Sequence, residues 1–176
     1  MSAQTIEIRD ARESDAEQML GIYAPYVRDT VITFEEVVPE LEQFRDRVRK
    51  YLSGWRCLVV VQDDRLLGYA YGSTHRERSA YRWSVETTIY LDPTVHRQGL
   101  GRRLYGALLP ALAEAGYCNA FAGITLPNAA SVGLHQAMGF EPIGTFSRVG
   151  YKLGAWRDVG WFQLRLRDEP PQRSSS

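Results

Sequence analysis

Apolar and polar residues alternate along the chain in patterns that predict both strands and helices. Seven runs rich in β-branched and aromatic residues read as strands, and four segments carry helical spacing or helix start and stop signals. The strands are predicted over residues 5–9, 55–62, 65–71, 83–91, 117–125, 140–149 and 158–166, and the helices from 14 to the region of 25 and over 39–53, 99–116 and 128–138. This order predicts an α+β fold in three layers, with about seven strands in one mixed sheet and about four helices covering its faces.

Short local signals define the ends of several elements. Ser14-Asp15-Ala16-Glu17 has the form of a capping box, which predicts the start of the first helix. Asp63-Asp64, between two apolar runs, predicts the turn of a hairpin. Asn128 is suited to cap a short helix, and Gly139 is suited to end it.

Prolines and polar stretches mark the remaining boundaries. Pro25 is expected to end or bend its helix, and Pro110 to kink or divide another. Residues 72–82 are predicted to form a polar loop, and residues 150–157 to join the last two strands. We expect residues 1–167 to be one domain, followed by a polar, flexible tail over 168–176.

Composition and charge exclude several classes of protein. The 176 residues contain 21 Lys and Arg and 21 Asp and Glu, and this balance argues against a general nucleic-acid binder. No apolar run approaches the roughly 20 residues that span a bilayer, and the first residues lack the plan of a signal peptide. Cys57 and Cys118 form no disulfide framework, and no zinc spacing occurs. We therefore expect a cytoplasmic protein with buried free thiols and no metal site.

The stretch from Glu86 to Arg103 carries the most informative pattern. A predicted strand stops at Asp92-Pro93, and Gly99-Leu100-Gly101 opens a helix, with Arg102 among the arginines beside it. The first turn of a helix offers free N–H groups and a positive dipole end, which suit a phosphate. The same glycines also fit an ordinary strand-to-helix turn. The spacing lacks the third glycine of a dinucleotide fingerprint and the Lys-Ser/Thr of a Walker loop.

Together with its neighbours, this stretch resembles the GCN5-related N-acetyltransferase family over nearly the whole chain. Residues 99–101 resemble the family's pyrophosphate loop, and residues 128–140 resemble its second landmark, Asn-capped and ending in Gly-Phe. Within the family, residues 78–86 and 150–160 resemble the phosphinothricin and methionine sulfoximine acetyltransferase branch. The resemblance implies a mixed, mostly antiparallel sheet. One departure is His96, where the family loop has Gln or Arg.

The resemblance also implies acetyl-CoA as cosubstrate and assigns residues to it. Backbone amides of the loop would hold the pyrophosphate, and one strand edge would pair with the pantetheine arm, which Asn128 also reaches. The loop residues are Arg97, Gln98, Gly99, Leu100, Gly101 and Arg102, and the strand residues are Ile89, Tyr90 and Leu91.

Acetyl transfer to an amine needs a base and a proton donor. Glu86 matches the branch's base and lies in an otherwise uncharged run, where apolar surroundings raise a carboxyl pKa. Alternatively, Glu86 is an ordinary solvated residue of the strand. His135 follows Leu134 where many family members have tyrosine, and so is the candidate acid. His135 could equally be a packed residue, and Tyr105 is a weaker alternative. A backbone N–H near Leu91 could stabilise the oxyanion.

The branch acetylates the α-amino group of small amino-acid analogues and is usually homodimeric. Arg76 and Arg78 are the candidates for holding a substrate carboxylate, although both could be solvated loop residues. Phe34, Tyr81 and Lys152 are candidates for the pocket wall.

We expect direct attack in a ternary complex, because no cysteine or serine stands out as an acyl carrier. Two alternatives remain open. One is an acetyltransferase for another amine, such as an aminoglycoside, a polyamine or a protein N-terminus. The other is a CoA-binding regulatory module without turnover.

Overall fold

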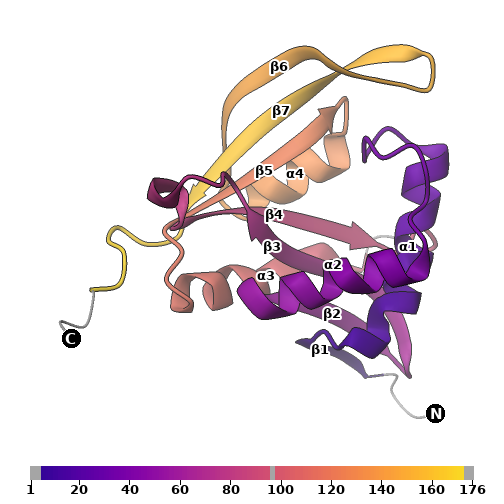
Figure 1. The fold of residues 1–176 in the computed structure, drawn as a ribbon, viewed down its shortest axis with the longest axis horizontal. Helices are drawn as coiled ribbons and strands as arrows, with labels where there is room; N and C mark the ends of the chain where they lie inside the picture. The colour runs from indigo at the N-terminus through magenta and orange to yellow at the C-terminus, as the bar shows by residue number, and fades with distance from the viewer. Residues whose placement is uncertain (1–4, 96–97, 173–176) are drawn as a thin grey trace.

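A seven-stranded mixed sheet organises the chain, with strand order β1-β2-β3-β4-β5-β7-β6 (Figure 1). The structure is a computed structural model, and it describes residues 5–95 and 98–172. The strands are β1 (Ile6–Asp10), β2 (Cys57–Gln62), β3 (Arg65–Thr74), β4 (Ser84–Leu91), β5 (Asn119–Leu126), β6 (Glu141–Lys152) and β7 (Ala155–Arg165). The helices are α1 (Ala16–Asp29), α2 (Leu41–Gly54), α3 (Leu100–Glu114) and α4 (Ala129–Ala137), with single 3-10 turns at Glu13–Asp15 and Ser79–Tyr81.

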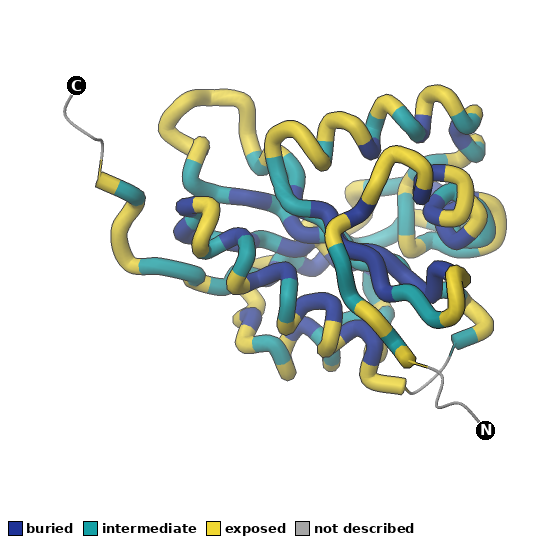
Figure 2. Tube along the Cα trace, turned by 90° about the horizontal axis from the view of Figure 1, so that it is seen from below, coloured by how far each residue is buried: buried dark blue, intermediate teal, exposed yellow. Residues whose placement is uncertain are grey.

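The helices cover both faces of the sheet. Successive residues of β2 point to opposite faces, so Val59 packs with α1 and α2 while Val60 packs with α3. Both valines are fully buried, which explains why this strand is apolar without alternation. In Figure 2 the buried stretches run through the middle of the molecule and the exposed stretches form its rim. The three-layer α+β fold predicted from the sequence is confirmed.

Several local predictions are also confirmed. Asp63 and Asp64 have φ angles of 47° and 65°, as the hairpin turn between β2 and β3 requires. The Asn128 side chain accepts a hydrogen bond from the Ser131 backbone N–H at 3.1 Å and so caps α4. Gly139 follows the end of α4 with a φ of 93°, a conformation that favours glycine.

Other local predictions are wrong. The capping box at Ser14–Glu17 does not form; a 3-10 turn precedes α1 instead, and the Asp15 carboxylate accepts the Arg12 backbone N–H at 2.7 Å. α1 continues past Pro25 and α3 past Pro110, so of the effects expected of these prolines the helix end and the division do not occur. Tertiary packing of the apolar faces of these helices offsets the hydrogen bond that each proline removes.

Parts of two segments predicted as loops are strands, namely residues 72–74 of the first and residues 150–152 and 155–157 of the second. β3 continues to Thr74, where Ser73 pairs with Glu86 of β4. β6 and β7 extend until only Leu153-Gly154 joins them, and both of these residues have positive φ angles, 50° and 74°. The polar and glycine residues in these segments hide the strand pattern, because sheet pairing and not local preference fixes them.

Candidate active site

The central feature of the site is a divergence between two neighbouring strands. β4 and β5 form the one parallel pair among the described strands, and only residues 84–86 and 119–121 are paired. Beyond Glu86, β4 keeps its ladder with β3 but has no described strand partner on the β5 side. The backbone of residues 87–91 therefore borders a gap in the sheet.

Four cavities follow this gap in series, and each shares lining residues with the next. At the α3 end a cavity of about 360 Å³ is lined by Gln98, Gly99, Leu100, Gly101 and Arg102, and the next, of about 210 Å³, by Ile89, Tyr90, Leu91 and Asn128. A small space of about 60 Å³ then leads to a cavity of about 400 Å³ beside Glu86. The structure thus brings the predicted cofactor residues and the predicted base to one continuous groove. Arg97 and His96 lie outside the described residues.

Glycine shapes the α3 end of this groove. Gly99 has a φ of 67° and directly precedes the first residue of α3, Leu100. Gly101 lies against α4, since a Cβ there would be 2.9 Å from Leu134 Cδ2. The two helices can therefore approach closely only because residue 101 has no side chain. Arg103 lies elsewhere, with its guanidinium donating to the Ile6 carbonyl at 3.1 Å.

Glu86 lies at the opposite end of the groove, with its side chain 28% exposed. His75 Nδ1 lies 3.1 Å from Glu86 Oε1, and Arg76 Nη1 lies 3.5 Å from the same oxygen. Burial raises the pKa of the Glu86 carboxyl above its usual value, and the two basic neighbours oppose this without cancelling it. A partly desolvated carboxyl of raised pKa is suited to act as a general base.

Sequence reasoning did not select His75, although the structure places it on the candidate base. Its ring stacks on Phe121 of β5, with the centroids 4.3 Å apart and the planes 12° apart. Tyr81 meets the same ring edge-on at 5.8 Å. The only signal for this arrangement is the β3–β4 register, which a single sequence does not reveal.

His135 and Tyr105 form a buried pair beside the smallest space of the groove. His135 Nδ1 lies 2.7 Å from the Ser131 carbonyl, which can only accept, so Nδ1 carries the proton. Neutral His135 then accepts at Nε2 from the Tyr105 hydroxyl, 3.0 Å away. Burial lowers the pKa of His135 and raises that of Tyr105, so both stay neutral near pH 7. In this arrangement Tyr105 is the donor and His135 orients it.

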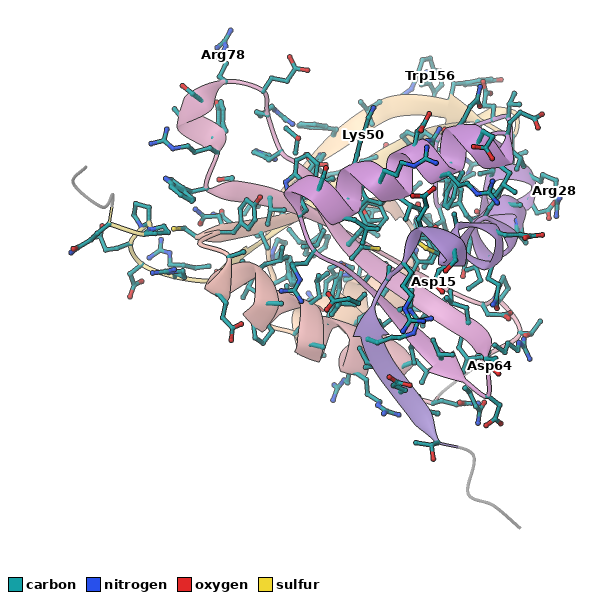
Figure 3. The ribbon with its side chains drawn as sticks, turned by 60° about the horizontal axis from the view of Figure 1, so that its bottom comes forward. Asp15, Arg28, Lys50, Asp64, Arg78 and Trp156 are labelled. Atoms are coloured by element: carbon teal, nitrogen blue, oxygen red, sulfur yellow. The ribbon has the colours of Figure 1, made fainter. Side chains whose placement is uncertain are left out.

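The four candidate substrate residues divide into two groups. Arg76 contacts Glu86, and Phe34 lines the Glu86 cavity together with Phe146, Val149 and Trp161 of the last two strands. Arg78 instead points outward from the tip of its loop (Figure 3). Tyr81 contacts His75 but does not line the cavities found along the described groove.

Lys152, considered for the pocket wall, is buried behind it. Its side chain holds the segment that carries Phe34, since Nζ donates to the carbonyls of Val27 and Thr33 at 2.8 Å each. The residue is 4% exposed, and burial lowers the pKa of its ammonium. Glu35, in the same segment, pairs with Arg47 of α2 at 2.5 Å. The segment beside the cavity is therefore tied to both α2 and β6.

The split sheet thus carries a glycine loop at one end of the split and a partly buried carboxyl at the other, the two features that the resemblance to an acyltransferase family implies. The acetyltransferase (GNAT) domain family matches residues 8–161, and the chain belongs to this family. The prediction of an N-acetyltransferase is thereby confirmed.

Three relatives place the chain within the family. A phosphinothricin N-acetyltransferase of Streptomyces coelicolor is 36% identical over 92% of this chain and 96% of its own length. An L-methionine sulfoximine/L-methionine sulfone acetyltransferase of Pseudomonas aeruginosa is 34% identical over 96% and 97%. The crystal structure of a phosphinothricin acetyltransferase from Sinorhizobium meliloti in complex with AcCoA superposes with a TM-score of 0.91, at 31% identity, covering 96% of this chain and 95% of that chain.

The described parts of the chain contain neither a membrane-spanning helix nor a cluster of metal ligands. No helix over residues 5–95 and 98–172 is long and apolar enough to cross a membrane. Within the same ranges, no group of three or more His, Cys, Asp or Glu could hold a metal ion.

Proposed function

We propose that this protein is an acetyl-CoA-dependent N-acetyltransferase for the α-amino group of a small amino-acid analogue of the phosphinothricin or methionine sulfoximine type. One observation carries the proposal. The groove that begins at the glycine loop ends at Glu86, a partly buried carboxyl of raised pKa. The cationic side chain of Arg76 lies 3.5 Å from one oxygen of this carboxyl. Relatives named for these substrates match 92% and 96% of the chain.

The groove residues fit acetyl-CoA, which when bound would supply the acetyl group as a thioester. The first turn of α3 would hold the pyrophosphate through the amides of residues 98–102, because a helix N-terminus attracts anions. The absence of a side chain at Gly101 lets this turn lie close against α4. The free edge of β4 at Ile89, Tyr90 and Leu91 would pair with an extended amide-bearing chain as an added strand does. Asn128 lines the same stretch of the groove.

The chain's own residues would move the protons. Glu86 would take one from the substrate ammonium, directly or through water, which leaves the amine neutral for attack. A backbone N–H near Leu91 would stabilise negative charge on the acetyl oxygen. The Tyr105 hydroxyl, which donates to His135 Nε2 in the structure, would turn toward the departing sulfur and give its one proton to it. The hydrogen bond between Tyr105 and His135 supports a joint role for the two residues.

The Glu86 cavity suits a small substrate that carries a carboxylate. Arg76 is half exposed and could turn from Glu86 to a substrate carboxylate, and Phe34 with Trp161 offers an apolar wall for the side chain. Arg78, on the outer face of its loop, would serve only if a second chain placed it beside a neighbouring site.

We also propose a homodimer, assembled through the β6–β7 hairpin. This hairpin lies at the end of the sheet and carries apolar residues that are each at least half exposed: Ile143, Phe146, Val149, Tyr151, Leu153 and Trp156. A monomer rarely exposes so many apolar side chains on one element. Light scattering on the purified protein, with Trp156→Glu (Figure 3) as the disrupting variant, tests this proposal.

Two simpler proposals complete this assignment. We place the protein in the cytoplasm, as its two buried free thiols are typical there. We treat residues 1–167 as one domain and 168–176 as a tail, since β7 ends at Arg165 and residues 166–172 form no helix or strand.

The central experiment measures thiol release and product mass with acetyl-CoA and a panel of amines. We expect turnover of phosphinothricin, methionine sulfoximine or methionine sulfone. Turnover of polyamines, aminoglycosides or peptide N-termini alone would refute the substrate assignment, and CoA binding without any turnover would identify a regulatory module. Glu86→Gln should lower kcat by about 10²–10⁴-fold with unchanged CoA affinity. Glu77→Gln, which changes an exposed glutamate in the loop before β4, is the matched control.

A further inference from the structure

We infer that His75 is a positioning residue that holds Glu86 ionised and oriented toward the groove. This inference rests on the proposed role of Glu86 as the base. The relatives' names identify their substrates and not the residue that controls the base, so the inference stands on the geometry of this chain.

The His75 ring is held on two sides. It stacks on Phe121, which pairs with Glu86 across the β4–β5 ladder, and Tyr81 closes its other edge. The side chain is 13% exposed, compared with 52% for Arg76. His75 is therefore held with Nδ1 facing Glu86 Oε1 at 3.1 Å, whereas the more exposed Arg76 lies 3.5 Å from that oxygen and donates to the His75 carbonyl at 2.9 Å.

The chemistry of this contact is directional. An ionised carboxylate only accepts hydrogen bonds, so His75 Nδ1–H donates to it, and this bond favours the charged form of Glu86. Burial acts in the opposite direction and favours the neutral acid. The charged or titratable groups that act on Glu86 are His75 and Arg76, both from the segment after β3, while its β5 neighbour Phe121 is uncharged.

Substrate binding can change which hydrogen-bond donors contact Glu86. If Arg76 turns toward a substrate carboxylate, His75 is the donor that stays on Glu86. The base then remains ionised at the moment when the substrate ammonium must lose its proton. His75 contacts Glu86 and need not touch the substrate.

Two substitutions separate this role from simple packing. His75→Phe keeps a ring on Phe121 but removes the donor. His75→Asn removes the ring but keeps an amide N–H close to the position of Nδ1. A packing role would make Asn the more harmful substitution, whereas a positioning role makes Phe the more harmful one.

The pH profile of kcat/KM is the decisive measurement. We expect His75→Phe to move the acidic limb up by about 1 pH unit, so that activity one unit below the wild-type limb falls roughly 10-fold. His75→Asn should keep the wild-type limb. A His75→Phe profile that superposes on the wild type, or a limb that moves equally in both variants, would overturn the inference.

Carbon NMR titration of the Glu86 carboxyl, assigned with Glu86→Gln, separates this inference from the proposed function. An upward shift of the Glu86 midpoint in His75→Phe supports the coupling even if no amine is acetylated, in which case only the proposed function fails. If the wild type acetylates its substrate but the Glu86 midpoint is not shifted in His75→Phe, the coupling between His75 and Glu86 is refuted and the proposed function is not.

Should His75→Phe fail to fold, nitrogen NMR of the histidine rings in wild type and Glu86→Gln makes the same test. The His75 Nδ1 signal should change between these two proteins. An identical signal would refute the contact.

Discussion

Replacing the buried Lys152 by methionine should destabilise the protein through a loop that borders the Glu86 cavity. The ammonium donates 2.8 Å hydrogen bonds to the carbonyls of Val27 and Thr33 and is almost fully shielded from solvent. Methionine has similar length and fills the space, but it offers neither carbonyl a donor.

The size of the effect follows from the two bonds. Hydrogen bonds from a charged group contribute about 1.5 kcal/mol each at the lower end of their range, or about 3 kcal/mol for the pair. Part of this is recovered, because burial penalises the ammonium, as its lowered pKa indicates, and methionine carries no charge. We expect a net loss of about 2 kcal/mol, which corresponds to a fall in Tm of about 4–8 °C for a domain of this size.

Thermal unfolding of Lys152→Met and of the control Lys50→Met measures this loss. Lys50 is exposed on α2 (Figure 3), and its replacement should change stability by less than about 0.5 kcal/mol. We also expect Lys152→Met to raise KM for the amine with little change in CoA affinity, because the loosened segment carries Phe34. Equal Tm values for the two variants would refute the reasoning.

Three further predictions concern the groove. Gly101→Ala should weaken CoA binding in calorimetry, because its Cβ would press on Leu134 at 2.9 Å, while Gly106→Ala on the same helix, which meets nothing within 4 Å, should bind normally. Asn128→Ala should lower the free energy of unfolding by about 1 kcal/mol through the lost cap, as urea denaturation would show; no change would remove the cap's role. The rate should fall as the pH drops through the raised pKa of Glu86, since only the ionised form accepts a proton, and a pH-independent kcat/KM would contradict its role as base.

Local chemistry in the sequence predicted the parts of the site that depend on near neighbours in the chain. Gly99 precedes a helix, Asn128 caps one, and Glu86 lies on a central strand, because each of these depends on a few adjacent residues. The resemblance to a known family then placed these parts in one groove.

Contacts between distant residues were not predictable in this way. His75 reaches Glu86 through the β3–β4 register, and Lys152 reaches Val27 across 125 positions of the chain. A polar residue at the end of a strand gives no sign that it will be buried. The same limit applies to Arg76 and Arg78, of which Arg76 lies against Glu86 and Arg78 at the outer tip of the loop.

Because β4 and β5 diverge, the two ends of the groove present different kinds of atoms to a ligand. At the β4 edge the groups available to a ligand are main-chain N–H and C=O groups; every amino acid supplies both, except proline, which lacks the N–H. Around Glu86 the wall consists of side chains, among them Phe34 and Trp161. Substitutions can therefore accumulate along residues 89–91 with little cost to ligand pairing, while a single exchange at Phe34 alters which amine fits. Under the proposed function, substitutions around Glu86 would change substrate preference among related proteins, while the β4 edge would continue to bind the same acyl donor.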